Sequence, residues 1–128
     1  MLPGGAGSSQ TISSPNFPKN YPSSVDCRWT ILADNNSRVK ITFLSFDIEA
    51  GSSCRYDSVS ILDGSKKQAL CGKSIPGPFE STSNNVTIQF KSDHSVQKKG
   101  FQAIISSVGK LLSFTMQLRI NNNLGLRR

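Results

Sequence analysis

The sequence predicts an all-β domain in which two antiparallel sheets stack as a sandwich. Short apolar runs separated by Ser, Asn, Gly and Pro recur along the chain, and this spacing is typical of many short strands. Within the runs, apolar and polar residues alternate, and no segment of residues 1–107 has a sustained helical period. Antiparallel strands with one apolar face must bury that face against another sheet, so a sandwich follows.

The expected elements follow in chain order. Residues 1–11 are rich in Gly and Ser and are expected to be loose, and the prolines of segment 14–22 exclude helix there. The next segments each carry apolar residues at every second position, the mark of a half-buried strand. These residues are Trp29 and Ile31; Val39, Ile41 and Phe43; Val59 and Ile61; Val86, Ile88 and Phe90; and Phe101 and Ala103.

The chain of 128 residues fits one domain, which we place at residues 1–107, followed by a basic extension at residues 108–128. Residues 112–120 alternate, so they are either one more strand or an amphipathic or disordered segment. The extension has four basic residues and no acid, which accounts for over half of the net charge of +7. The pairs Lys66–Lys67 and Lys98–Lys99 are expected in solvated loops. Nucleic-acid binders cluster such residues on one element with aromatic residues between them, so this function is not predicted.

Cysteines and sequons point to an extracellular protein. The chain has three cysteines, Cys27, Cys54 and Cys71. This odd count implies one disulfide plus a free thiol, or a partner outside this sequence. No Cys-x-x-Cys spacing occurs, which argues against zinc. Sequons for N-glycosylation begin at Asn35 and Asn85, and together with the cysteines they favour an oxidising compartment.

Neither a membrane span nor a leader is visible. No run approaches the roughly 20 apolar residues that cross a bilayer. Residues 1–5 lack the apolar stretch of a signal peptide. We therefore expect a piece of a longer secreted protein.

The sequence does not predict an enzyme. The only histidine is His94, and the preceding Asp93 points away from it on an extended chain, so the two do not form a base with its orienting carboxylate. Motifs of nucleophilic hydrolases, zinc proteases and nucleotide-binding proteins are absent from the sequence.

Three acidic residues lie at ends of expected strands. Glu49 and Asp93 each follow a strand, and Asp57 opens one with the inward parity of Val59 and Ile61. If these ends meet, the carboxylates repel one another unless they are protonated or neutralised. Calcium would neutralise them, because it takes six to eight oxygen ligands. The alternative, which the residues alone favour, is that each carboxylate accepts backbone hydrogen bonds within its own loop.

Several segments, in the same order, resemble those of CUB domains. Together they span about residues 4–105. The segments are Ser14-Pro15-Asn16-Phe17-Pro18-Lys19-Asn20-Tyr21-Pro22 with Cys27-Arg28-Trp29; Phe43-Leu44-Ser45-Phe46-Asp47-Ile48-Glu49; Cys54-Arg55-Tyr56-Asp57-Ser58-Val59; Cys71-Gly72; Phe90-Lys91-Ser92-Asp93-His94-Ser95; and Gly100-Phe101.

The resemblance implies a jelly-roll-like sandwich of two antiparallel sheets with a Cys54–Cys71 disulfide. Such a bridge stabilises the domain by roughly 3 kcal/mol in the chain-entropy model. The family usually has a second bridge from an N-terminal cysteine to the position of Cys27. This chain has Pro3 near that place and no fourth cysteine. Cys27 is therefore either free or paired outside this sequence.

The resemblance also implies calcium. Many CUB domains bind Ca²⁺ through one Glu and two Asp, and Glu49, Asp57 and Asp93 match these positions. Tyr21 matches a tyrosine that supports the ligands, and Ser95 matches a serine near the metal that can also contact the partner. Val96 stands where calcium-binding members often carry Asn, which puts affinity in question more than binding. With this resemblance, calcium becomes the preferred explanation of the three acids.

We therefore expect an extracellular, calcium-dependent protein-interaction module that binds a Lys or Arg side chain of a partner protein. It would be one module of a larger multidomain or oligomeric protein. Two alternatives are a metal-free CUB domain that binds glycans or sulfated polysaccharide, and a non-catalytic domain that positions the catalytic domain of a protease.

Overall fold

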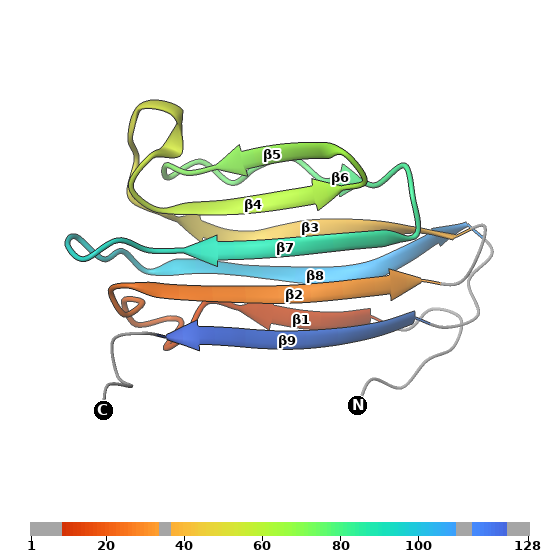
Figure 1. Cartoon of the computed structure of the whole chain (residues 1–128), viewed down its shortest axis with the longest axis horizontal. Coiled ribbons are helices and arrows are strands. Elements are labelled where there is room, and N and C mark those ends of the chain that lie inside the picture. Colours follow the sequence, from red (N-terminus) through yellow and green to blue (C-terminus); the bar gives the residue numbers. More distant parts are fainter. Residues whose placement is uncertain (1–8, 34–36, 110–113, 123–128) are drawn as a thin grey trace.

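The computed structural model describes residues 9–33, 37–109 and 114–122, with side chains through residue 108, and it is a sandwich of antiparallel sheets (Figure 1). Its only described helical segment is the 3₁₀ turn η1 (Ser52–Cys54), and no described helix has the length and hydropathy to cross a bilayer. The strands are β1 (Ser9–Ser13), β2 (Val25–Ala33), β3 (Ser37–Asp47), β4 (Ser58–Asp63), β5 (Lys66–Leu70), β6 (Phe79–Glu80), β7 (Asn85–Lys91), β8 (Gly100–Gly109) and β9 (Phe114–Asn122). The predicted all-β class is confirmed.

The nine described strands form one sheet of four and one of five. The four-stranded sheet has the order β1-β8-β3-β6, and the five-stranded sheet has the order β5-β4-β7-β2-β9. Every strand pair is antiparallel. Most strands that are neighbours in a sheet are distant in sequence, so each sheet combines strands from both halves of the chain. The two sheets lie one behind the other in Figure 1, with their strands roughly aligned.

The core lies between the sheets and is built from the predicted alternation. Every apolar residue that the alternation placed on an inward face is buried. Aromatic rings connect the two layers, because Phe101 of the four-stranded sheet meets Trp29 and Phe90 of the other at ring-centre distances of 5.6 and 5.8 Å. Edge-to-face and tilted arrangements of this kind are favourable beyond their buried area.

Two local expectations are wrong. Residues 9–11 are not loose, because they belong to β1, which pairs with β8. Lys66 and Lys67 lie in β5 rather than in a loop. β5 is an edge strand with mostly exposed side chains, so it lacks the apolar alternation that marks a half-buried strand. Lys98 and Lys99 do lie in a loop, just before β8.

A β-bulge at Leu44 interrupts the pairing of β3 with β8. Phe43 pairs with Ala103 and Ser45 with Gln102, which leaves Leu44 without a partner in the register. The extra residue changes the parity of the strand, because the buried residues are Phe43 before the bulge and Phe46 after it. The bulge therefore sets which residues at the end of β3 face inward.

The C-terminal segment contributes a strand. Of the two possibilities left open for residues 112–120, the described part forms β9, which pairs with β2 from Val25↔Asn122 to Ala33↔Phe114. β9 is an edge strand of the five-stranded sheet. The division of the chain at residue 107 stays a prediction.

Candidate metal centre

The three carboxylates singled out in the sequence lie together at one end of the sandwich. Glu49 follows β3, Asp57 precedes β4 and Asp93 follows β7, so three separate chain segments contribute one acid each. One ligand atom from each residue can be chosen so that all lie within 4.8 Å of one another. Three strand ends thus meet as the sequence argument required, although their function stays a proposal.

Asp57 is the buried centre of this cluster. It has no exposed surface, in agreement with its predicted inward parity. Its Oδ2 accepts a hydrogen bond from the Tyr21 hydroxyl at 2.6 Å, and its Oδ1 accepts one from the backbone N–H of Asp93 at 2.8 Å. Burial raises the pKa of Asp57 to about 6, and the charges of Asp93 and Glu49 add to this, while the two hydrogen bonds oppose it.

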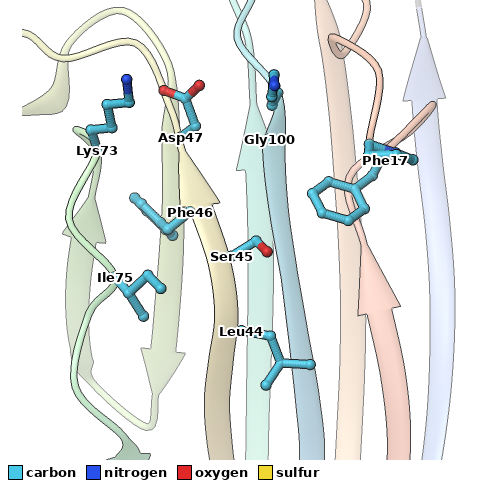
Figure 2. Close-up of a pocket in the computed structure, with 10 residues that line it drawn as sticks. Phe17, Leu44, Ser45, Phe46, Asp47, Lys73, Ile75 and Gly100 are labelled. Carbon is cyan, nitrogen blue, oxygen red and sulfur yellow. The ribbon is translucent and has the colours of Figure 1, made fainter.

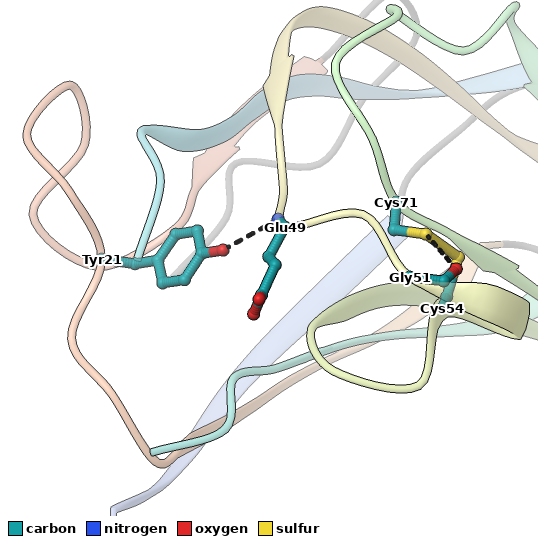
Figure 3. Close-up of a disulfide and its surroundings, with 5 residues drawn as sticks. All are labelled: Tyr21, Glu49, Gly51, Cys54 and Cys71. Carbon is teal, nitrogen blue, oxygen red and sulfur yellow. Dashed lines mark hydrogen bonds between the residues drawn. A yellow bond between two sulfur atoms is a disulfide. The ribbon is translucent and has the colours of Figure 1, made fainter. Parts of the chain in front are cut away.

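Tyr21 connects two of the three segments. Besides donating to Asp57, its hydroxyl accepts a hydrogen bond from the backbone N–H of Glu49 at 3.2 Å (Figure 3). The ring is buried and lies edge-on to Phe90 at 4.8 Å between ring centres, and the Tyr21 N–H donates to the carbonyl of Lys98. Burial, helped by the hydrogen bond to Asp57, raises the pKa of Tyr21 far above its ordinary value. The hydroxyl therefore stays protonated at neutral pH and donates to Asp57.

Glu49 carries an unsatisfied oxygen. Its backbone is fixed by the bond to Tyr21 and by the preceding residue, because Ile48 and Gly72 exchange two backbone hydrogen bonds at 2.9 Å. Its Oε1 is buried and has no hydrogen-bond partner among the described residues. A buried carboxylate oxygen without a donor is costly. A bound cation would satisfy it.

Asp93 is held by its own loop and by the segment before β2. Its carbonyl accepts from the N–H of Ser24 and its Oδ1 accepts from the N–H of Ser95 at 3.2 Å. Ser95 is exposed beside the cluster, and Val96, the departure from the calcium-binding pattern, is also exposed. A backbone hydrogen bond within the acid's own loop is the alternative to calcium that the residues alone favour. Asp93 accepts such a bond from Ser95, whereas Asp57 accepts from groups distant in the sequence.

The expected disulfide joins Cys54 and Cys71, whose Cα atoms are 5.6 Å apart (Figure 3). It ties the segment between Glu49 and Asp57 to the segment that pairs with Ile48, so it limits the freedom of both. Cys27 is free and buried in β2. Burial, with a smaller contribution from the charge of Asp26, raises the pKa of its thiol to about 11. Among the described residues Cys27 has no disulfide partner, and pairing with a cysteine outside this sequence stays a prediction.

Only one of the two sequon asparagines lies among the described residues. Asn85 is exposed at the start of β7, at the turn that leads into this strand. Asn35 lies outside the described residues. Glycosylation of either residue stays a prediction.

The CUB domain family model matches residues 6–104, a range that contains the whole carboxylate cluster and ends before β9. Human tolloid-like protein 1 is 43% identical over 101 residues, which are 75% of this chain and 10% of that protein. Rat procollagen C-endopeptidase enhancer 1 is 41% identical over 100 residues, 73% of this chain and 21% of that protein. The chain thus spans a small part of these relatives.

Solved structures agree with this match. A crystal structure of the MASP-1 CUB2 domain bound to Ca²⁺ superposes with a TM-score of 0.71 at 35% identity, covering 76% of this chain and 90% of that one. The extracellular region of zebrafish Gpr126/Adgrg6 gives a TM-score of 0.76 at 39% identity, covering 79% of this chain and 14% of that one. One of these similar structures therefore carries a calcium ion.

Proposed function

Since the chain belongs to the CUB family of protein-interaction modules, we propose that it is an extracellular module that binds Ca²⁺ at Glu49, Asp57 and Asp93 and presents this site to a basic side chain of a partner protein. The observation that carries the proposal is the buried Oε1 of Glu49, which has no hydrogen-bond partner among the described residues and lies in a cluster of three carboxylates. The calcium-bound MASP-1 CUB2 domain supports the choice of ion.

The chemistry of the donors suits this ion. Calcium prefers carboxylate and other oxygen ligands and tolerates irregular geometry. Zinc prefers nitrogen and sulfur ligands, but the cluster contains neither His nor Cys. Two groups hold Asp57 in place: the Tyr21 hydroxyl and the Asp93 N–H. When bound, the ion would supply the positive charge that keeps all three carboxylates ionised.

The partner contact follows from the charge balance. Three carboxylates and one Ca²⁺ leave one net negative charge at the cluster. The exposed Ser95 lies at its rim, where its hydroxyl can contact a partner. A Lys or Arg of a partner would find an acceptor already fixed by the fold, so little conformational entropy is lost on binding. One such exposed contact is weak and sensitive to salt, so useful affinity requires several modules acting together.

The proposal predicts that calcium stabilises the domain. At a calcium concentration of 100 times Kd, binding adds about 2.7 kcal/mol to the free energy of unfolding. In a domain of this size, this raises the melting temperature by about 10 °C. Isothermal titration calorimetry and thermal melting of the wild type and of Asp93→Asn test this, and the variant should lose most of the heat and the shift.

Asp47→Asn is the matched control. Asp47 lies two residues before Glu49 and is not a member of the cluster, so its neutralisation should leave calcium binding unchanged. Equal melting temperatures of the wild type in calcium and in chelator would exclude the calcium site. Calcium binding without any change in affinity for lysine-bearing partners would leave the metal site standing but remove its proposed role in recognition.

The proposal also includes an extracellular compartment and a parent protein longer than this chain. The Cys54–Cys71 disulfide is expected to persist in an oxidising environment, and one similar structure is described as an extracellular region. The relatives that carry such a domain are much longer than this chain. We place the chain in a larger secreted protein, in which it contributes binding rather than catalysis. Retention on heparin without any response to calcium would instead favour the polysaccharide-binding alternative.

A further inference from the structure

A concave surface lies at the end of β3 in the four-stranded sheet (Figure 2). Its volume is about 470 Å³, within the range of about 300–1,000 Å³ that is usual for ligand pockets. Apolar side chains line it from three segments that are distant in the sequence: Phe17, Leu44, Phe46 and Ile75. We call this surface the bulge groove.

The bulge groove exists because of the irregularity in β3. Leu44 is the residue without a partner in the register, and its side chain is 45% exposed. Ile75, which comes from the segment after the disulfide, is 54% exposed. Figure 2 shows both side chains on the same face of the molecule. Bulges re-aim side chains, and this one places Leu44 in the lining of the same hollow as Ile75, on the other side of β3 (Figure 2). Apolar residues gathered in one hollow differ from the scattered apolar residues of an ordinary surface.

The polar rim of the bulge groove is predominantly positive. Lys73 and Lys99 line it together with a single acid, Asp47. Among the described residues, neither lysine takes part in an ion pair. Lys19 and Lys98, each next in sequence to a lining residue, are also exposed. The groove therefore combines an apolar floor with unpaired positive charge.

We infer that the bulge groove binds a segment of a partner protein that carries a large apolar side chain followed by acidic residues. The apolar side chain occupies the floor between Leu44 and Ile75, and the carboxylates meet Lys73 and Lys99. A sulfated polysaccharide fits less well, because it would leave the apolar floor uncovered. This surface recognises the opposite charge from the one proposed for the carboxylate cluster, and it needs no metal.

A pair of designed peptides tests this inference. The probe is the acetylated and amidated peptide Gly-Phe-Gly-Glu-Glu-Gly, and its control carries Lys-Lys in place of Glu-Glu. The methyl NMR signals of Leu44 and Ile75 report binding. All titrations contain chelator, so failure of the calcium site leaves this test unaffected. The acidic peptide should shift both methyl signals, and the basic peptide should shift neither.

Charge-reversal variants complete the experiment. Lys73→Glu/Lys99→Glu should weaken binding of the acidic peptide by about tenfold or more, because two exposed attractions become repulsions. The matched control Lys66→Glu/Lys67→Glu changes the same charge on the edge strand β5, outside the groove, and should bind like the wild type. Equal loss in both variants, or methyl shifts with the basic peptide, would overturn the inference. Shifts produced by a heparin oligosaccharide and not by the acidic peptide would assign the groove to polysaccharide instead.

Discussion

At the scale of single residues, the Tyr21 hydroxyl is what holds the carboxylate cluster together. It donates to Asp57 and accepts from the N–H of Glu49, so it links residues that are 28 and 36 positions away. The aromatic ring is itself fixed by Phe90 and by the carbonyl of Lys98. A side chain with both donor and acceptor capacity and a rigid apolar body is suited to this position.

Tyr21→Phe should keep the ring packing and lose both hydrogen bonds. Asp57 is then left with one hydrogen bond in a buried place, which costs about 1–2 kcal/mol of stability. We also expect weaker calcium binding, because the carboxylate is less well fixed. Urea unfolding with and without calcium measures both effects. Tyr56→Phe, which alters an exposed tyrosine, should change neither quantity.

Asp63 gives a dependence on pH that is separate from the cluster. Its carboxylate is buried and accepts hydrogen bonds from the N–H and hydroxyl of Thr82 and from the hydroxyl of Ser83. Burial acts to raise the pKa of Asp63, but these hydrogen bonds outweigh it and lower the pKa below its ordinary value of 3.8. The folded state therefore favours the ionised form. This stabilisation is present above pH 3.8 and is lost as the pH falls through the lower folded value.

Asp63→Asn should therefore destabilise the domain by about 1–2 kcal/mol at neutral pH. The difference from the wild type should shrink once the pH falls below 3.8. Chemical unfolding at several pH values provides the test. Glu80→Gln, at an exposed residue with only a surface ion pair, is the control. A difference that stays constant down to the acid limit would contradict the assigned role.

At the scale of elements, the start of β8 depends on a glycine. Gly100 has a φ of +92°, and a Cβ at this position would overlap the hydroxyl of Ser14. That hydroxyl accepts a hydrogen bond from the N–H of Phe101, and the N–H of Ser14 donates to the Phe101 carbonyl. The close approach joins the end of β1 to the start of β8, next to the loop that carries Lys98.

Gly100→Ala should destabilise the domain by about 2 kcal/mol or more, because the left-handed backbone alone costs an alanine roughly 1–2 kcal/mol and the overlap adds to it. Gly64→Ala separates the two causes, since Gly64 also has a positive φ but has open space around it. It should show the smaller loss. Thermal melting of both variants gives the comparison, and equal losses would argue against the overlap.

At the scale of the whole molecule, β9 closes one edge of the five-stranded sheet. It pairs along the full length of β2, although the family match ends at residue 104. Without β9, the backbone groups on that side of β2 would be unpaired, and exposed edges of this kind promote association between chains. The strand Phe114–Asn122 of the extension is thus part of the sheet.

A chain that ends after Gly109 should keep the sandwich, because the family match lies within the part that remains. It should lose at least about 1 kcal/mol of stability, the net contribution of one or two hydrogen bonds, and should self-associate as its concentration rises. Unfolding measurements and sedimentation velocity detect these changes, with a chain that ends after Asn122 as control. A monomeric, equally stable short chain would show that β9 does not protect the edge.

The sequence predicted the parts of this fold that follow from one-faced burial. Alternation identified the segments that became β2, β3, β4, β7 and β8. It missed β5, whose side chains are mostly exposed, and β1, which has only one buried residue, Ile12. The bulge is also visible in the sequence, because the apolar positions change parity between Phe43 and Phe46.

The candidate site was predictable only in part. The residues alone indicated three acids at strand ends, and the family resemblance was needed to prefer calcium. No sequence pattern could show that the Asp93 backbone donates to Asp57 or that one oxygen of Glu49 has no donor, because both depend on the packing of loops. The bulge groove combines segments around residues 17, 44 and 75. Only the topology of the four-stranded sheet and the disulfide-linked loop brings these together.

The buried thiol of Cys27 has a practical consequence for following the domain in solution. It is the chain's only cysteine outside the disulfide. Its side chain has no exposed surface, and its partners in the sheet are Phe90 of β7 and Ile120 of β9. A thiol-specific reagent can reach it only when this part of the sandwich opens. The rate of labelling in native buffer therefore measures how often β2 separates from its neighbours, without any engineered cysteine.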